Sequence, residues 1–302
     1  MPSNFKSGFV ALIGRPNVGK STFINQVMTQ KISIISPKPQ TTRNQIRGIY
    51  TTDQEQIIFI DTPGIHKPKN SLGEYMNKES LSTLKEVDLI LWIIDGTEKF
   101  GKGDEFILDV LKDVKTPIFL VVNKIDLIKN KHALMENIIK FTEDREFDEV
   151  FYISALNGEK MDDVLASINK YLEEGPLYYP KDQVSDHPEQ FIISEIIREK
   201  VLLLTREEVP HSIAVVIDYM GYEEENENLM NIRATIYVER PSQKNIIIGN
   251  KGEMIKNIGT MARKEIVMIL GQKIFLELWV KVEKDWRNKE SQMKRMGYNL
   301  VK

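Results

Sequence analysis

The 302-residue sequence predicts two domains of different fold class, an α/β domain with a mostly parallel sheet and helices on both faces, followed by an α+β domain. Short apolar runs alternate with longer amphipathic stretches up to about Leu172. A segment with three prolines follows, and beyond it the periodicity changes. We therefore expect a first domain over residues 1–174, a linker over 175–188 and a second domain over 189–302.

In the first domain, five runs that are apolar on successive residues predict buried parallel strands. They are Phe9–Ile13, Ile57–Ile60, Leu89–Ile94, Ile118–Val122 and Val150–Ile153. Helices are expected between them at Ser21–Met28, Leu72–Leu84, Asp104–Val114 and Met161–Leu172. Right-handed crossovers place the loops that follow the strands along one edge of the sheet, where ligands bind.

The second domain is expected to have the order helix, strand, strand, helix, strand, with a half-exposed sheet. These elements are predicted at Glu189–Leu204, Ser212–Tyr219, Leu229–Glu239, Glu253–Leu270 and from Ile274 to Val282. Phe275 and Trp279 project from the face of the last strand opposite its aliphatic stripe. We expect another element to cover them, with base stacking as the alternative.

Charge is unevenly distributed, although the net charge is only −3. Residues 189–227 carry 3 Lys/Arg against 10 Asp/Glu, and residues 228–302 carry 15 against 7. This pattern fits either a polyanion-binding face or an ordinary charged surface. The absence of cysteine excludes disulfides and thiolate metal sites. Residues 1–8 lack an apolar stretch, so we expect no secretory signal and a cytoplasmic location.

A phosphate-binding loop is predicted after the first strand, where a GxxxxGK[ST] motif opens a helix. Its residues, with the threonine that follows, are Gly14, Arg15, Pro16, Asn17, Val18, Gly19, Lys20, Ser21 and Thr22. Glycines let backbone N–H groups turn toward an anion, and the helix N-terminus adds its dipole. Lys20 can reach the β- and γ-phosphates, and the Ser21 hydroxyl can bind Mg²⁺.

A second motif, Asp61-Thr62-Pro63-Gly64 with Ile65 after it, ends the next strand. A carboxylate at this position can hold Mg²⁺ through its water shell. Gly64 lets the backbone approach the γ-phosphate and donate its N–H group. In register after a phosphate loop, the motif predicts the metal side of a nucleotide site.

Two further motifs predict guanine specificity. Asn123-Lys124-Ile125-Asp126 follows a strand, and the Asp126 carboxylate can accept hydrogen bonds from guanine N1–H and the exocyclic amine, a donor pair that adenine lacks. The Lys124 stem can cover the base, and Asn123 can tie neighbouring loops together. Ser154-Ala155-Leu156 ends the next strand, where a backbone N–H could meet the guanine oxygen.

Together GRPNVGKS, QTTRN, DTPG, NKID and SAL resemble the Era-like branch of bacterial P-loop GTPases. The resemblance implies binding of GTP and GDP with Mg²⁺, hydrolysis of GTP, and a first switch that contains Thr41 and Thr42. One of these threonines completes the Mg²⁺ shell, beside Ser21 and Asp61, and the spacing does not decide which.

Catalysis is expected to involve Lys20, Gly64, the switch threonines Thr41 and Thr42, and Asn17. Ras-like GTPases have a glutamine where this chain has Ile65, which cannot orient a water molecule. In related GTPases an asparagine at the position of Asn17 helps to bind K⁺. K⁺-stimulated hydrolysis and a simple loop-capping role for Asn17 are equally compatible with the sequence.

The second domain contains a GxxG loop that resembles that of a KH domain of type II order. Such a loop lets a sugar–phosphate backbone pass close to the main chain, beside a groove for about four unpaired nucleotides. The residues expected to bind RNA are Ile248, Gly249, Asn250, Lys251, Gly252, Lys256, Arg263 and Lys264. The alternative is a small α+β domain that binds a protein partner.

Over nearly the whole chain, the resemblance implies a GTPase switch that binds the 3′ end of 16S ribosomal RNA during assembly of the 30S subunit. It also implies peripheral association with the cytoplasmic membrane. The basic tail Lys281–Lys302 could touch anionic lipid, or form a solvated or RNA-facing helix. A monomer is expected. A metabolic ATPase or kinase would require an adenine pocket instead of Asp126.

Overall fold

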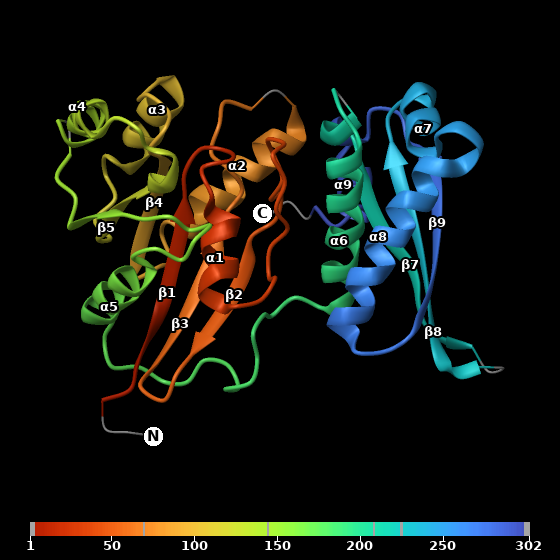
Figure 1. Ribbon diagram of the computed structural model, residues 1–302, viewed down its shortest axis with the longest axis horizontal. Coiled ribbons are helices and arrows are strands. Elements are labelled where there is room, and N and C mark those ends of the chain that lie inside the picture. The colour runs from red at the N-terminus through yellow and green to blue at the C-terminus, as the bar shows by residue number, and fades with distance from the viewer. Residues whose placement is uncertain (1–3, 69, 144, 208, 224–225, 299–302) are drawn as a thin grey trace. The chain divides into compact units, whose positions relative to one another are not determined.

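The computed structural model describes residues 4–298 apart from Lys69, Asp144, Glu208 and the pair 224–225 (Figure 1). The chain forms two compact units. The first comprises Met1–Ile35, Thr42–Lys69 and Gly73–Asp186, and the second Ser36–Thr41, Asn70–Leu72 and His187–Lys302. The last four residues of the predicted basic tail, 299–302, lie outside the described residues. None of the described helices is long and apolar enough to span a bilayer.

The first unit contains a six-stranded sheet in the order β2-β3-β1-β4-β5-β6. Every pair is parallel except β2 with β3, which confirms the predicted mostly parallel sheet. The strands are β1 (Lys6–Ile13), β2 (Ile46–Thr51), β3 (Glu55–Asp61), β4 (Leu89–Asp95), β5 (Ile118–Asn123) and β6 (Glu149–Tyr152).

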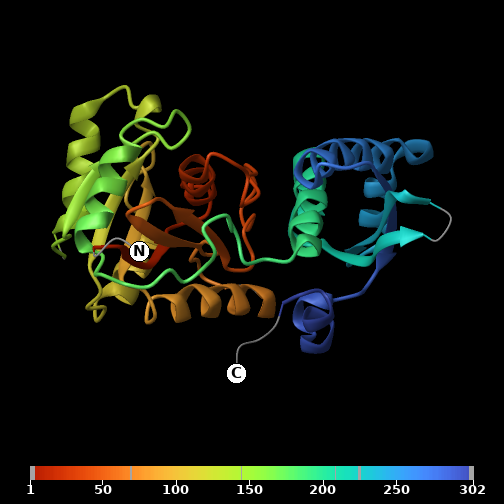
Figure 2. The same ribbon diagram turned by 90° about the horizontal axis from the view of Figure 1, so that it is seen from below.

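Helices cover both faces of this sheet, as predicted. They are α1 (Lys20–Met28), α2 (Ser71–Thr83), α3 (Lys102–Leu111), α4 (Lys131–Thr142) and α5 (Met161–Tyr171), with a short 3-10 helix η1 (Ile125–Leu127). Alternate residues of each strand face opposite layers. Val10 and Leu12 of β1 pack in one core with α1 and α5, whereas Ala11 and Ile13 pack in a second core with α2, α3 and α4. Figure 2 shows α1 and α2 on opposite sides of the sheet.

The segment predicted to be a linker is hydrogen bonded to the sheet over much of its length. The side-chain carbonyl of Gln56 accepts the N–H groups of Tyr178 and Tyr179 at 2.8 and 3.0 Å, and its amide donates to the Tyr179 carbonyl at 2.9 Å. The Ile49 N–H donates to the carbonyl of Val184 at 2.9 Å. Residues 175–186 therefore extend the first unit along its antiparallel edge strand β2.

The second unit contains a three-stranded sheet in the order β7-β8-β9, with β7 antiparallel and β9 parallel to β8. Its elements are α6 (Glu189–Leu204), η2 (Val209–His211), β7 (Ala214–Glu223), β8 (Asn226–Val238), α7 (Pro241–Ile248), η3 (Asn250–Gly252), α8 (Glu253–Leu270), β9 (Ile274–Val282), η4 (Trp286–Asn288) and α9 (Glu290–Arg295). The predicted α+β class is confirmed. The structure adds one helix, α7, to the predicted order, because the apolar run before the GxxG loop is helical.

One face of this sheet packs against α6 and α8. Ile232, Ala234, Ile236 and Val238 of β8 are fully buried there, as their alternation predicted. The expectation that another element covers Phe275 and Trp279 was wrong for the described residues, because these side chains are 52% and 55% exposed. They lie on the opposite face of the sheet.

Candidate functional site

The residues predicted to bind nucleotide lie in four loops at the carboxyl ends of β1, β3, β5 and β6. They are Gly14, Arg15, Pro16, Asn17, Val18, Gly19, Lys20, Ser21 and Thr22 after β1; Asp61, Thr62, Pro63, Gly64 and Ile65 at the end of β3; Asn123, Lys124, Ile125 and Asp126 at the end of β5; and Ser154, Ala155 and Leu156 after β6. Parallel strands bring these loops to one edge of the sheet, as the sequence indicates.

The loop after β1 is held in a conformation that requires glycine at two positions. Gly14 and Gly19 have φ of 149° and 104°, which residues with a Cβ rarely adopt. A Cβ on Gly19 would lie 2.2 Å from Asn123 Nδ2, and one on Gly14 would lie 2.2 Å from the Ile93 carbonyl oxygen. The loop therefore fits tightly between its neighbours while α1 begins directly after it.

Lys20 is buried at the centre of this loop. Its ammonium donates to the carbonyl oxygens of Gly14 at 3.1 Å and Arg15 at 3.0 Å. Burial lowers the pKa of Lys20 to about 8, and the negative charge of Asp61 opposes this shift. A buried ammonium that donates to two carbonyl oxygens, with one carboxylate acting on it electrostatically, is suited to an anionic ligand.

Three hydroxyl groups surround the Asp61 carboxylate. Its Oδ2 atom accepts from Ser21 at 2.7 Å, from Ser33 at 2.8 Å and from Thr42 at 3.3 Å. Ser21 Oγ and Thr42 Oγ1 are 3.0 Å apart. Among the described residues Oδ1 of Asp61 is buried without a hydrogen-bond partner. Burial raises the pKa of Asp61, and Lys20 and the hydroxyl groups oppose the shift.

These oxygen atoms fit Mg²⁺, which prefers one or two carboxylates, hydroxyls and water. An unpartnered buried carboxylate oxygen beside two hydroxyl groups is an acceptor suited to a hydrated cation. Thr41 does not join this cluster, because its hydroxyl donates to the Lys38 carbonyl at 2.6 Å. The geometry thus distinguishes the two switch threonines. Ser33 was not predicted, because a serine in a polar loop carries no signal of its partner.

The loop after β3 packs directly against the loop after β1. A Cβ on Gly64 would lie 2.8 Å from the Pro16 nitrogen, so the two backbones approach as only glycine allows. The Thr62 hydroxyl donates to the Leu12 carbonyl at 2.6 Å, and the Ile65 N–H donates to the Gly14 carbonyl at 3.2 Å. The Ile65 side chain is fully buried in the core. The Ile65 side chain is therefore not available to a ligand.

Asn123 connects three of the four loops. Its amide donates to the Val18 carbonyl at 2.9 Å, and its side-chain oxygen accepts the Ala155 N–H at 2.9 Å. Because the Ala155 N–H is used in this way, the exposed Leu156 offers the next main-chain donor along the loop. Through these two hydrogen bonds, Asn123 connects the loop after β5 to the loops after β1 and β6.

Lys124 and Asp126 are oriented differently. Lys124 has φ of 66°, and its ammonium lies 2.5 Å from Asp95 Oδ2. Burial alone would raise the pKa of Asp95, but hydrogen bonds from Lys124 and Thr97 outweigh it and lower the pKa. The Asp126 side chain is exposed, and in the described part of the chain no hydrogen bond or ion pair holds its carboxylate. It is available to a ligand.

The side chain of Arg15 turns away from the phosphate-binding position. Its guanidinium donates to Asp104 at 3.0 Å and to Glu98 at 2.6 Å, which connects the loop to α3 and to the turn before it. Asn17 is exposed at the tip of the loop, with φ of 65°. The partners of Arg15 are about ninety residues away in the chain, so the motif alone could not reveal them.

The GxxG loop lies between α7 and α8. Gly249 and Gly252 have φ of 73° and 82°, and a Cβ on Gly249 would lie 2.6 Å from Met254 Cβ. In contrast, no described atom lies within 4 Å of a Cβ added to Gly252. Ile248 is the last residue of α7, and Asn250 and the exposed Lys251 form the turn. The loop thus presents an open main chain beside the positively charged side chain of Lys251.

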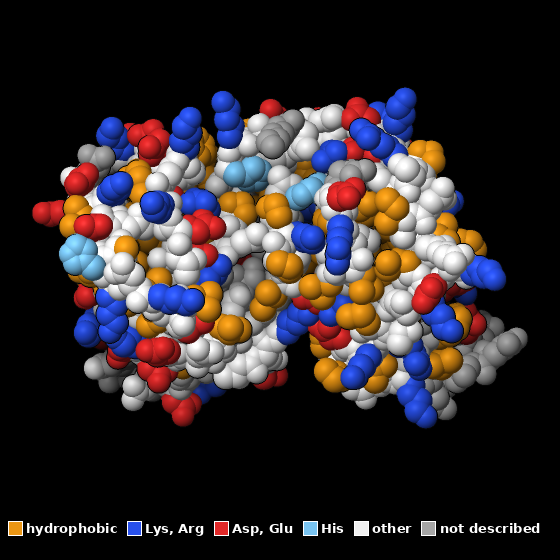
Figure 3. Space-filling view, turned by 45° about the horizontal axis from the view of Figure 1, so that its top comes forward, with side chains coloured by type: hydrophobic (Ala, Val, Ile, Leu, Met, Phe, Trp, Pro, Cys, Tyr) orange, Lys and Arg blue, Asp and Glu red, His pale blue; other side chains and the backbone are white. Residues whose placement is uncertain are grey.

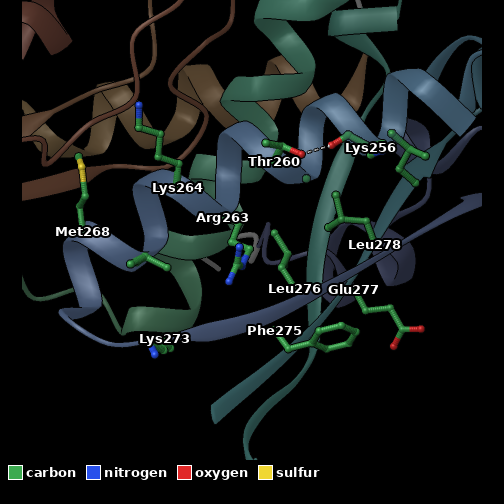
Figure 4. Close-up of a pocket in the computed structure, with 13 residues that line it drawn as sticks. Lys256, Thr260, Arg263, Lys264, Met268, Lys273, Phe275, Leu276, Glu277 and Leu278 are labelled. Atoms are coloured by element: carbon green, nitrogen blue, oxygen red, sulfur yellow. Dashed lines mark hydrogen bonds between the residues drawn. The ribbon is translucent and has the colours of Figure 1, made fainter. Parts of the chain in front are cut away.

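A groove of about 810 Å³ runs between α8 and β9 (Figure 4). Lys256, Arg263 and Lys264 line it from α8, and Lys273 lies at its end. Arg263 donates to the Ile274 carbonyl at 3.0 Å, so its guanidinium is fixed across the groove. Leu276 and Leu278 form the apolar floor. Figure 3 shows Lys and Arg side chains intermingled with hydrophobic ones on the visible surface of this unit.

Comparison with known proteins agrees with this geometry. Residues 9–124 match the family described as 50S ribosome-binding GTPase, and residues 208–287 match the KH domain family. A crystal structure of Era in complex with MgGDPNP and nucleotides 1506–1542 of 16S ribosomal RNA is 44% identical, with a TM-score of 0.94, covering 98% of this chain and 100% of that chain.

A second crystal structure, of a point variant of Aquifex aeolicus Era bound to GDP.AlF4⁻, is also 44% identical. Its TM-score is 0.93, and the match again covers 98% of this chain and 100% of that one. With 98% of the chain covered, each match extends over both units. The chain therefore belongs to the Era family, in which a GTPase domain is joined to a KH domain.

Proposed function

We propose that this protein binds GTP and GDP with Mg²⁺ in the four-loop site, hydrolyses GTP, and binds single-stranded ribosomal RNA in the α8–β9 groove. The observation that carries the proposal is the convergence of Lys20, Asp61, Asn123 and Asp126 on one edge of the sheet. The similarity to Era bound to MgGDPNP and to a 16S ribosomal RNA fragment supports both ligands. Residues 1–174 would carry the GTPase and residues 189–302 the RNA site.

In this proposal Lys20 contacts the β- and γ-phosphates, Gly64 donates its N–H to the γ-phosphate, and Asp126 accepts from guanine. Ser21, Thr42 and Asp61 would hold Mg²⁺, which supplies positive charge against the phosphates when bound. Thr42 is the preferred switch ligand because its hydroxyl lies beside Ser21. The buried Ile65 side chain cannot orient the attacking water, so that role falls to main-chain groups near Gly64 and the switch threonines.

We further propose that the protein acts in assembly of the 30S subunit as a cytoplasmic monomer. Peripheral membrane association is part of the same proposal. The described part of the basic tail, residues 281–298, carries Lys284, Lys289 and Lys294 on its surface. Sedimentation with anionic vesicles tests this association, and equal sedimentation with neutral vesicles would contradict an electrostatic mode.

The groove predicts a specific effect of Gly252→Asp on RNA binding. The new carboxylate would project into open space beside the loop, where the RNA backbone passes, and would repel it. We expect affinity for single-stranded RNA to fall by roughly tenfold or more, since a phosphate contact becomes a repulsion. Filter binding over a range of salt concentrations measures this loss.

Gly252→Asn is the matched control for this change. Asparagine tolerates φ near 82° and carries no charge, so it separates backbone strain from charge repulsion. Unchanged RNA affinity in the aspartate variant would argue that the groove binds a protein partner instead.

K⁺ should stimulate GTP hydrolysis if Asn17 helps to bind a monovalent cation near the phosphates. We expect rates about tenfold higher in K⁺ than in Na⁺, because a fixed positive charge stabilises the transition state. Asn17→Ala should remove the difference. Steady-state phosphate release in the two buffers measures it, and equal rates for the unaltered protein would leave Asn17 with a loop-capping role only.

GTP affinity should depend on pH above neutrality because the pKa of Lys20 is lowered to about 8. Below that pH the ammonium is present before binding, so affinity is constant. Above it the free protein has lost this proton and must take one up when GTP binds. The affinity should therefore fall as the pH rises, and the decrease should approach about tenfold per pH unit. Calorimetry between about pH 7 and 9, a range that brackets the lowered pKa and in which guanine keeps its N1 proton, measures this slope. Lys20→Ala should bind weakly without the slope, and a constant affinity in the unaltered protein would refute the assignment.

A further inference from the structure

The sheet of the second unit has one face without a covering helix over most of its area. Residues 231, 233 and 235 of β8 point to this face, opposite the buried stripe that packs on α6 and α8. Only its far end is covered, where Arg295 of α9 lies 5.2 Å above the ring of Tyr237 and Tyr237 is buried. In the remainder, which we call the open face, Arg233 is exposed, whereas Asn231 and Thr235 are buried.

Three aromatic side chains lie on the open face. Phe275 and Trp279 of β9 are 52% and 55% exposed, and Tyr219 of β7 is 38% exposed. Phe275 and Trp279 are four residues apart on one strand, so their Cα atoms are separated by roughly 13 Å. Large aromatic side chains are usually buried or serve in recognition, and two on one short edge strand indicate a binding surface.

Arg233 lies between these aromatic residues and is held in place. The sheet register pairs it with Tyr219 on one side and Glu277 on the other. Its guanidinium lies 5.3 Å above the Tyr219 ring and forms ion pairs with Glu223 at 2.7 Å and Glu277 at 3.5 Å. The open face is thus a flat surface of rings and a guanidinium plane, which is the kind of surface on which nucleic acid bases stack.

The open face is continuous with the α8–β9 groove. Phe275 also lines the groove, and Figure 4 shows Leu276 and Leu278 on the side of β9 toward α8, with Phe275 and Glu277 on the other side. Exposed Lys273 and Lys281 flank Phe275 and Trp279 along the strand. A chain that leaves the groove at Phe275 would reach Trp279 by passing Glu277, whose charge is paired with Arg233. Lys273 and Lys281 would add positive charge at the two ends of this path.

We propose that the open face is a second RNA-binding surface, on which bases of a single strand that leaves the groove stack on Phe275 and Trp279. This inference rests on the proposed function of the groove. The groove accepts about four nucleotides. The open face would extend the site by the nucleotides that cross β9, with little dependence on base identity, because every base has a stacking surface.

Trp279→Leu tests the proposal in the full chain, because Trp279 does not line the groove. The probes are single-stranded fragments of 16S ribosomal RNA nucleotides 1506–1542, from about four nucleotides upward, with affinity measured by fluorescence anisotropy. Trp279→Leu should bind the shortest active fragment like the unaltered protein, and longer fragments roughly tenfold more weakly. Ile269→Ala, at an exposed residue outside the groove lining, is the control. It should change neither the affinity for the shortest fragment nor that for longer fragments.

Tryptophan fluorescence gives an independent readout. The chain has three tryptophans, and Trp92 and Trp286 are fully buried, so Trp279 alone is accessible. Long fragments should quench its emission and protect it from acrylamide, while the shortest fragments should not. If long RNA binds no better than short RNA and leaves Trp279 accessible, the open face is not an RNA surface although the groove is. If no RNA binds at all, the proposed function of the groove fails as well.

Discussion

Asp126→Asn should lower the affinity for GTP by on the order of a thousandfold or more and create affinity for xanthosine triphosphate. A site built around hydrogen bonds to a base rejects a partner that cannot form them by several orders of magnitude. The asparagine amide would face two guanine donors with one acceptor and one donor of its own. Xanthine carries a carbonyl in place of the exocyclic amine, and the same amide can donate to it.

The exposed Asp126 carboxylate makes this a clean test, because no group in the described part of the chain depends on it. The free energy of unfolding should change by less than about 0.5 kcal/mol. Calorimetry with GTP, ATP and xanthosine triphosphate measures the preference, and Asp163→Asn on the exposed surface of α5 is the control. ATP bound as tightly as GTP by the unaltered protein would contradict the guanine assignment.

The sequence predicted the parts of the fold whose signals are local. The inner strands β1, β4 and β5 are apolar on successive residues because both of their faces are buried, and this pattern is difficult to confuse with a loop. The nucleotide-binding motifs follow β1, β3, β5 and β6, and their residues can bind one ligand only if these loops lie together. The order of the motifs therefore predicted the edge of the sheet at which they lie.

Two elements of the first unit were missed because their patterns are mixed. Strand β2 is an antiparallel edge strand that contains Gly48 and exposes part of both faces, so neither alternation nor a continuous apolar run marks it. Helix α4 buries Leu134, Ile138 and Phe141, but Met135 and Ile139 are exposed beside them. Because of these additional apolar residues, the sequence does not show the single apolar face by which an amphipathic helix is recognised.

Other features depend on partners that are distant in sequence. The segment after Gly175 has the composition of a linker, and its hydrogen bonds to Gln56 depend on a strand more than one hundred residues earlier. Two contacts between residues nearly thirty positions apart were also missed: Ser33 donates to Asp61 at the end of β3, and Lys124 donates to Asp95 at the end of β4. Helix α7 did carry a local signal, since Pro241 begins it and Gln243 caps it, but the three isoleucines that follow also fit a strand.

Asp61→Asn should reduce GTP hydrolysis in the presence of Mg²⁺ by on the order of a hundred- to a thousandfold. The amide keeps the size of the side chain and an oxygen that can accept from Ser21 and Ser33, but it loses the negative charge beside the unpartnered buried oxygen. A metal at the phosphates is worth several kcal/mol of transition-state stabilisation, and each 1.4 kcal/mol is about tenfold in rate. Losing most of that interaction gives the expected range.

Ser33→Ala separates the charge of Asp61 from its hydrogen bonds. It removes one donor to the same carboxylate and leaves the charge, so hydrolysis should fall by about tenfold at most, as for other residues that orient a metal ligand. Single-turnover hydrolysis in Mg²⁺ and in EDTA measures both variants. The unaltered protein and Ser33→Ala should both respond to Mg²⁺, whereas Asp61→Asn should show little response. If Asp61→Asn responds to Mg²⁺ as fully as Ser33→Ala, the metal is held elsewhere, and the unpartnered oxygen of Asp61 needs a different explanation.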